Sequence, residues 1–109
     1  MAVKDLVVFD DNNFDAQVLG RDGLTVVDFW STTCVPCTQL KKVLGQVAED
    51  VPETVMIGTV NGDENHGLLA RYGVRGFPTL LFIKNGEVVE IRSGVDRKQV
   101  LKKVIETHA

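Results

Sequence analysis

Hydrophobic residues along this chain gather in short runs separated by polar turns, and the spacing inside each run predicts its secondary structure. Residues 24–30, Leu-Thr-Val-Val-Asp-Phe-Trp, carry β-branched and aromatic side chains at both alternating sets of positions. That composition is typical of a strand that is covered on both faces. Shorter apolar runs at residues 7–9 and 55–61 predict two more strands. We therefore expect residues 24–30 to form the central strand of a sheet.

A longer segment has the periodicity of an amphipathic helix. From Pro36 onward, apolar side chains recur at i, i+3, i+4 and i+7 until Pro52 interrupts the pattern. A proline in the first turn of a helix is harmless, because the N–H it lacks has no partner there. The pattern predicts a helix from Pro36 to the residues just before Pro52, with one face toward the sheet.

Two short helices are indicated by turn and capping residues. Asp11 or Asn12 is the expected cap of a helix that ends near Gly20, and residues 68–72 predict another helix that Gly73 ends. Both helices connect predicted strands. They give the first two-thirds of the chain an alternation of strands and helices.

The last third of the chain predicts a hairpin and a final helix. Residues 79–83 and 87–91 flank Lys84-Asn85-Gly86, and Asn-Gly between two such runs is a strong hairpin signal. Asp96 is the expected cap of a last helix, with residues 106–109 frayed. The resulting order βαβαβαββα predicts an α/β fold: a central mixed β-sheet flanked by helices on both faces.

Size and charge limit the classes of function. The chain has 109 residues and a net charge of -3, which predicts a single domain over residues 1–109 that can bury its own core. Lysines and arginines are scattered, so we expect neither nucleic acid nor a membrane as partner, and we expect a monomer. No apolar stretch approaches the roughly 20 residues of a membrane helix, and residues 1–5 do not begin a signal peptide. We therefore expect a cytoplasmic protein.

The chain's two cysteines form a Cys-Val-Pro-Cys motif at residues 34–37. On a helix, positions i and i+3 share a face, so Cys34 and Cys37 can form a disulfide. A disulfide this short closes almost no loop and stabilises the fold little, which favours a reversible redox pair over a structural bridge. The alternative is half of a metal site. Zinc needs about four ligands, and beyond carboxylates only His66 and His108 remain, so we expect no metal.

Four motifs together carry a resemblance to a known family. They are Val27-Asp28-Phe29-Trp30, the Cys-Val-Pro-Cys motif, Gly76-Phe77-Pro78-Thr79 and Lys84-Asn85-Gly86-Glu87. In this order and at this spacing, the chain resembles the thioredoxin family over essentially its whole length. The resemblance implies a thioredoxin fold and a protein-disulfide reductase without a bound cofactor, whose working group is the redox-active disulfide Cys34-Cys37. It implies disulfide-containing protein substrates and regeneration by a thioredoxin reductase.

The two cysteines are expected to have different roles. Cys34 precedes the long helix, where free backbone N–H groups and the helix dipole favour a thiolate. Because the thiolate is the nucleophile in disulfide exchange, we expect Cys34 to attack the substrate and Cys37, one turn deeper, to resolve the mixed disulfide.

Asp28 is the third candidate catalytic residue. Strand alternation places it on the same face as Val26 and Trp30, in an apolar layer where burial should raise its pKa. The resemblance implies that Asp28 lies beneath Cys37 and takes its proton; the alternative is an aspartate that only hydrogen-bonds the backbone. Thr59 stands where the family usually has a lysine, so we expect Asp28 to lack its buried cationic partner and to be harder to ionise, or more dependent on water, than in a typical member.

The resemblance also implies a docking surface around the sulfurs. The Phe77–Pro78 peptide bond should be cis, and a substrate segment should pair with the backbone of Phe77 as an added strand. For Trp30, core packing is the alternative role. The expected surface consists of an apolar patch and two glycines that admit a partner's backbone: Trp30, Val35, Pro36, Phe77, Pro78 and Val95, with Gly76 and Gly94.

Two departures from the family pattern leave other functions open. Thr33 replaces the usual tryptophan and Val35 the usual glycine, so both should change the choice of partner. One alternative is a more oxidising or specialised exchange protein tuned by these residues. The other is a non-catalytic adaptor with a thioredoxin fold, against which the complete set of Cys34, Cys37 and Asp28 argues.

Overall fold

A computed structural model describes residues 6–109. Its core is one five-stranded sheet with the strand order β1-β3-β2-β4-β5. Strands β1, β3 and β2 run parallel, whereas β4 and β5 are antiparallel to their neighbours. The predicted mixed sheet with residues 24–30 at its centre is confirmed. The strands are β1 (Val7–Phe9), β2 (Leu24–Trp30), β3 (Met56–Asn61), β4 (Thr79–Lys84) and β5 (Glu87–Ser93).

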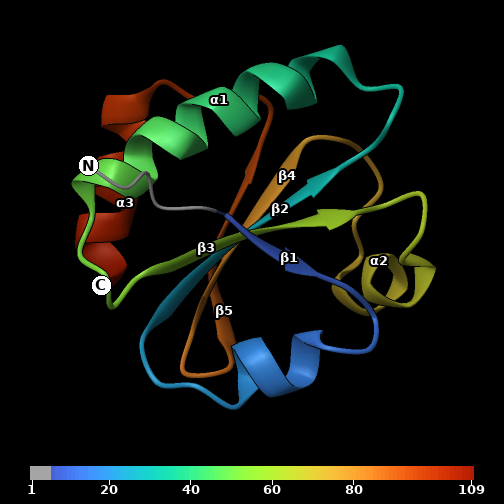
Figure 1. Ribbon diagram of the computed structural model, residues 1–109, viewed down its shortest axis with the longest axis horizontal. Coiled ribbons are helices and arrows are strands. Elements are labelled where there is room, and N and C mark those ends of the chain that lie inside the picture. The colour runs from blue at the N-terminus through green and yellow to red at the C-terminus, as the bar shows by residue number, and fades with distance from the viewer. Residues whose placement is uncertain (1–5) are drawn as a thin grey trace.

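Helices cover both faces of the sheet, as the predicted α/β fold requires (Figure 1). On one side lie α1 (Val35–Asp50) and α3 (Lys98–His108), and on the other lie η1 (Asp15–Leu19), a short π-helical turn, and α2 (His66–Tyr72). Each side has its own cluster of buried apolar side chains. The sheet is therefore the middle layer of three.

Strand β2 contributes to both cores because its side chains alternate. Val26 packs with the residues of α1 and α3, whereas Val27 and Phe29 pack with those of η1 and α2. Every β2 residue except Trp30 is buried. By the same alternation Asp28 shares the face of Val26, which directs a carboxyl group toward α1.

The predicted cap of the first short helix is wrong. Neither Asp11 nor Asn12 caps η1; its N-terminal flanking residue is Phe14, without a side-chain cap. The Asp11 carboxylate instead accepts a hydrogen bond of 3.0 Å from the backbone N–H of Leu68 in α2. The predicted end near Gly20 is confirmed, since Gly20 follows the last residue of η1.

Both predicted ends of the last helix are also wrong. Arg97, not Asp96, precedes α3, because the Asp96 carboxylate is held by Arg92, whose Nε lies 2.6 Å away. Residues 106–108 continue the helix rather than fray. His108 ends the helix against β5, with Nε2 3.0 Å from Oε1 of Glu90.

The predicted hairpin is confirmed, with one irregularity. Asn85 (φ 52°) and Gly86 (φ 84°) both adopt the left-handed backbone that such a turn requires. The register between β4 and β5 shifts between Phe82 and Ile83, which pair with Glu90 and Val88, so that Val89 is left over as a bulge. Nothing in the local sequence pattern indicates this bulge.

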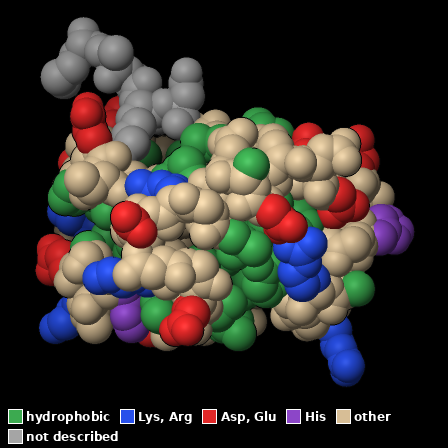
Figure 2. All heavy atoms as spheres, turned by 90° about the horizontal axis from the view of Figure 1, so that it is seen from below, with side chains coloured by type: hydrophobic (Ala, Val, Ile, Leu, Met, Phe, Trp, Pro, Cys, Tyr) green, Lys and Arg blue, Asp and Glu red, His purple; other side chains and the backbone are tan. Residues whose placement is uncertain are grey.

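The surface carries charges of both signs. On the face seen in Figure 2, acidic and basic side chains are interspersed around a central hydrophobic area. Within residues 6–109 no helix combines the length and hydrophobicity needed to cross a membrane. The prediction about a signal peptide falls on residues 1–5, which lie outside the described residues.

Candidate active site

The two cysteines form a disulfide where β2 leads into α1. Cys34 is the residue that precedes α1, and its extended backbone lets its Sγ accept a hydrogen bond of 3.2 Å from the N–H of Cys37. The Cα atoms are 5.3 Å apart, as the i, i+3 spacing predicted. Cys34 is half-buried, whereas Cys37 is 3% exposed. The outer sulfur is thus accessible to a partner and the inner one is shielded.

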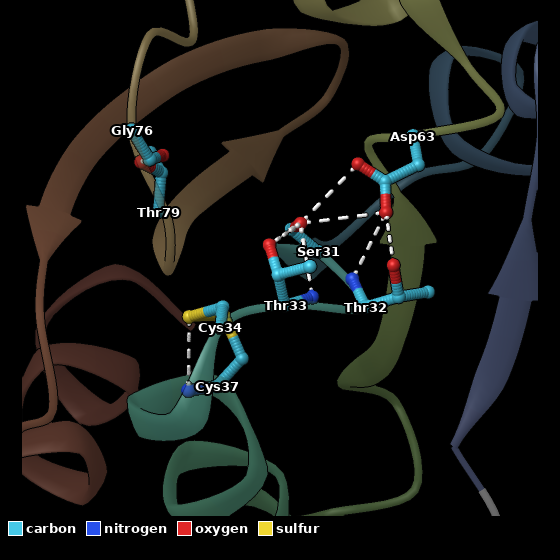
Figure 3. The surroundings of a disulfide bond; sticks show 8 residues. All are labelled: Ser31, Thr32, Thr33, Cys34, Cys37, Asp63, Gly76 and Thr79. Atoms are coloured by element: carbon cyan, nitrogen blue, oxygen red, sulfur yellow. Dashed lines mark hydrogen bonds between the residues drawn. A yellow bond between two sulfur atoms is a disulfide. The ribbon is translucent and has the colours of Figure 1, made fainter.

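The loop before Cys34 is braced by Asp63, a residue that sequence reasoning missed. The Asp63 carboxylate accepts hydrogen bonds from Thr32, at 3.0 Å from its N–H and 2.6 Å from its hydroxyl, and from the Ser31 hydroxyl at 3.2 Å (Figure 3). These hydrogen bonds hold the pKa of Asp63 below its usual range, and those from Thr32 contribute most. The brace joins residues more than 30 positions apart, so no local pattern could have shown it.

Asp28 is buried without a hydrogen-bond partner. Its exposed fraction is 0%, and among residues 6–109 neither carboxylate oxygen has a hydrogen-bond partner. Burial raises the pKa of Asp28 from 3.8 to about 7, while the positive charge of Lys41 acts in the opposite direction. The alternative reading of Asp28 as a backbone-bonded aspartate is therefore wrong. The direction predicted for its pKa is confirmed.

As expected, β3 supplies Asp28 with no buried cationic partner, but an exposed lysine on another element places a positive charge near it. Thr59 is the neighbour of Asp28 on β3, and it supplies no charge. The charge comes instead from Lys41 on α1. Lys41 follows Cys37 by four residues and so shares its helical face, a signal already present in the sequence.

One hollow brings the reactive groups together. It has a volume of about 240 Å³, and its walls include both cysteines, Asp28, Trp30 and Lys41. Cys34 and Cys37 enter it from the start of α1, and Asp28 enters from the centre of β2. This agrees with the implied position of Asp28 beside Cys37.

A separate groove contains half of the predicted docking residues. Gly76, Phe77, Pro78 and Gly94 line a groove of about 390 Å³. The Phe77–Pro78 peptide bond is cis, as the resemblance implied. The groove is held together because the N–H of Gly94 donates to the carbonyl oxygen of Pro78 at 3.1 Å. The loop containing Phe77–Pro78 lies in the surroundings of the disulfide, where Gly76 and Thr79 are seen (Figure 3).

The other predicted docking residues lie outside this groove. Val35 is 79% exposed beside Cys34, and Pro36 is exposed too. Val95 is 40% exposed and lines neither hollow. Trp30 is half-buried, not a core residue, with the Lys41 ammonium 5.9 Å from the centre of its ring. The predicted surface is therefore divided between two hollows and an exposed apolar rim.

A shielded and an accessible cysteine at a helix N-terminus, beside a buried carboxyl group, define the site of a dithiol–disulfide exchange protein. Residues 5–107 match the family model described as thioredoxin. The chain belongs to the thioredoxin family.

Relatives cover nearly the whole chain. It is 39% identical over 98 residues to a thioredoxin of Chlorobaculum thiosulfatiphilum, covering 90% of this chain and 91% of the relative. It is 38% identical to thioredoxin 2 of Chlorobaculum tepidum, covering 90% of both chains. To thioredoxin 1 of a Nostoc species it is 34% identical, covering 90% of this chain and 92% of the relative.

Family and site agree on the class of reaction. The protein is a thiol–disulfide oxidoreductase that reduces disulfides by dithiol–disulfide exchange. Over the described part of the chain, no group of three or more His, Cys, Asp or Glu residues is placed to hold a metal ion.

Proposed function

We propose that Cys34 is the attacking thiol, that Cys37 resolves the mixed disulfide and that Asp28 accepts the proton of Cys37. One observation carries the proposal: an accessible Cys34 and a buried Cys37 share a hollow with a carboxyl group that, among the described residues, has no hydrogen-bond partner. The N–H of Cys37 that points at Cys34 in the disulfide can also stabilise a Cys34 thiolate. The more reactive sulfur is thus also the one that a substrate can reach.

The reaction transfers two electrons from the protein to the substrate. The Cys34 thiolate attacks one sulfur of a substrate disulfide, a mixed disulfide forms, and the other substrate sulfur leaves as a thiolate. Cys37 then loses its proton to the Asp28 carboxylate, and its thiolate attacks Sγ of Cys34. The Cys34–Cys37 disulfide forms, the mixed disulfide breaks and the second substrate thiolate is released.

The raised pKa of Asp28 suits this role. A general base works best when its pKa lies near the operating pH, and burial places the pKa of Asp28 at about 7. Near neutral pH a substantial fraction of the protein therefore holds Asp28 ionised and able to accept a proton. The apolar surroundings that raise the pKa also keep the proton transfer away from bulk water.

The substrate is a protein segment in extended form. We infer that it lies along the groove beside Phe77 and adds a strand there. A Cβ atom on Gly76 or Gly94 would meet nothing within 4 Å, so a partner's backbone has room to approach both positions. Val35 and Trp30 would contact substrate side chains next to the sulfurs, and Pro36 and Val95 would extend the apolar rim.

The partners follow from the chemistry of the pair. A reductant that ends each cycle as a disulfide must be reduced again, and we infer that a thioredoxin reductase does this. The protein then needs no bound cofactor of its own. A pair that is kept reduced belongs in a reducing compartment, which favours the cytoplasm.

Trapping the intermediate tests the assignment of the two cysteines. We expect Cys37→Ser to accumulate the mixed disulfide with a protein substrate, because nothing resolves it. Cys34→Ser should form no such adduct and should reduce no substrate. The assignment would be overturned if Cys34→Ser formed a mixed disulfide through Cys37 as fast as Cys37→Ser forms one through Cys34. Mass spectrometry of the adducts identifies the sulfur that is joined.

A further inference from the structure

We propose that Lys41 is a positioning residue for the resolving step: its ammonium group is the cation that acts on the Asp28 carboxylate across the active-site hollow. This inference rests on the proposed role of Asp28. The positive charge near Asp28 then comes from α1, because the register partner of Asp28 on the neighbouring strand β3 is uncharged.

The helix directs Lys41 toward the reacting groups. Lys41 follows Cys37 by one helical turn, so the two side chains lie on the same face of α1. Both residues line the hollow that contains Asp28. The Lys41 ammonium lies 5.9 Å from the centre of the Trp30 ring, within the range of a cation–π interaction. Trp30 thus helps to keep the charge at the mouth of the hollow.

The strand neighbours of Asp28 that the structure describes provide no charge. On β3 its register partner is Thr59, and on β4 it is Leu80. The further titratable groups in the hollow are Cys34 and Cys37 themselves. A buried carboxylate without a hydrogen-bond partner is stabilised chiefly by whatever positive charge is near. In this hollow that charge is Lys41.

Lys41 also borders a second hollow, whose lining includes acidic residues. This hollow has a volume of about 540 Å³, and Trp30, Lys41 and Thr59 are among its lining residues. Asp10, Asp11 and Glu64 are the acidic residues in its lining. Because Lys41 is exposed, water and salt screen its effect on Asp28. We therefore expect an effect smaller than that of a buried ion pair.

The consequence is a shift in the pH at which the resolving step becomes fast. An opposite charge in contact moves a pKa by about 1–3 units, so a screened charge should move it by about 0.5 to 1 pH unit. Without Lys41, the Asp28 carboxylate is harder to form. The pH midpoint of the resolving step should rise by that amount, and the rate at pH 6 should fall about three- to tenfold.

The test compares three variants of the full chain. Lys41→Gln removes the charge, Lys41→Arg keeps it, and Lys42→Gln is the matched control, because Lys42 is also an exposed lysine of α1 but lines none of the described hollows. Two quantities are measured: the pH profile of release from a preformed mixed disulfide, and the titration of the Asp28 carboxyl carbon by NMR. We expect both midpoints to rise in Lys41→Gln, and to match the wild type in Lys41→Arg and Lys42→Gln.

Failure of this proposal differs from failure of the proposed function. If Lys41→Gln titrates like the wild type while Asp28→Asn abolishes the pH dependence, Lys41 is not the cation but Asp28 remains the base. If Asp28→Asn leaves the pH profile unchanged, the role of Asp28 is refuted and that of Lys41 falls with it. Equal shifts in Lys41→Gln and Lys42→Gln would overturn the specific role of Lys41.

Discussion

Asp28 should make the stability of the oxidised protein depend on pH, and Asp28→Asn should remove that dependence. The folded-state pKa of about 7 lies above the unfolded value near 3.8. Below the lower value the carboxyl group is protonated in both states and burial of a charge costs nothing. As pH rises from 3.8 toward 7, the unfolded state ionises first, so the wild type loses stability over this window. Above the folded-state value the loss is constant.

The expected magnitude follows from the two pKa values. A difference of about 3 pH units, at about 1.36 kcal/mol per unit, corresponds to about 4 kcal/mol. The amide introduced by Asp28→Asn would be buried with no more partners than the carboxyl group has, at a cost of about 1–3 kcal/mol that does not change with pH. The free energy of unfolding of the variant, relative to that of the wild type, should therefore rise by about 4 kcal/mol between pH 4 and pH 8, whatever the difference between the two proteins at pH 4.

Urea unfolding of the oxidised proteins at pH 4, 6 and 8 measures this gain, with the disulfide intact in both states. Asp50→Asn is a control of opposite sign, because a hydrogen bond from Lys98 lowers the pKa of Asp50. That variant should lose stability relative to the wild type above the unfolded-state pKa and match it in acid. A free-energy difference between Asp28→Asn and wild type that stays constant from pH 4 to pH 8 would refute the burial argument.

Four further substitutions test other parts of the structure. Gly58→Ala would place a Cβ atom 2.7 Å from the carbonyl oxygen of Val7, and should lower the free energy of unfolding by about 1–3 kcal/mol. Gly45→Ala, at a position in α1 with nothing within 4 Å, should raise it by up to about 1 kcal/mol in the same urea assay; a loss of stability there would contradict the open space. Thr32→Val deletes the hydroxyl that braces the loop before the disulfide, so attack on a substrate should slow severalfold in stopped-flow measurements while the Asp28-dependent pH midpoint stays fixed. Val35→Gly removes a side chain that is 79% exposed, and should raise KM for a protein substrate up to about fivefold, equivalent to about 1 kcal/mol; an equal change with a small-molecule disulfide would show that Val35 acts on the sulfurs instead of the substrate.

The elements that the sequence predicted well are those with strong local patterns. Strand β2 is apolar on both alternating faces because it packs against both helical layers. Helix α1 has the predicted span to within about one residue at each end, since Pro36 and Pro52 restrict where it can begin and end. The Asn85-Gly86 turn needs left-handed backbone at both residues, which Asn and Gly tolerate.

Two of the failures concern carboxylates that bond groups other than the helix ends they were expected to cap. Asp11 has the residue type of a cap for η1, but its carboxylate bonds the N–H of Leu68, 57 positions away. Asp96 has the residue type of a cap for α3, but its carboxylate forms a salt bridge with Arg92. A capping residue can be recognised locally, whereas its choice among several donors depends on which segments the fold brings close.

The candidate site, too, has features that the sequence predicted and others that it did not. The redox pair could be recognised from spacing alone, because two positions on one helical turn suffice to form it. The raised pKa of Asp28 could also be predicted, but the source of the positive charge near it was missed, because that source depends on which face of β2 lies under which face of α1. Once that packing is known, Lys41 is one turn beyond Cys37 and above the same hollow. A positive charge needed at a buried carboxylate can therefore come from the helix as well as from the neighbouring strand, and an uncharged Thr59 does not by itself leave Asp28 without a cation.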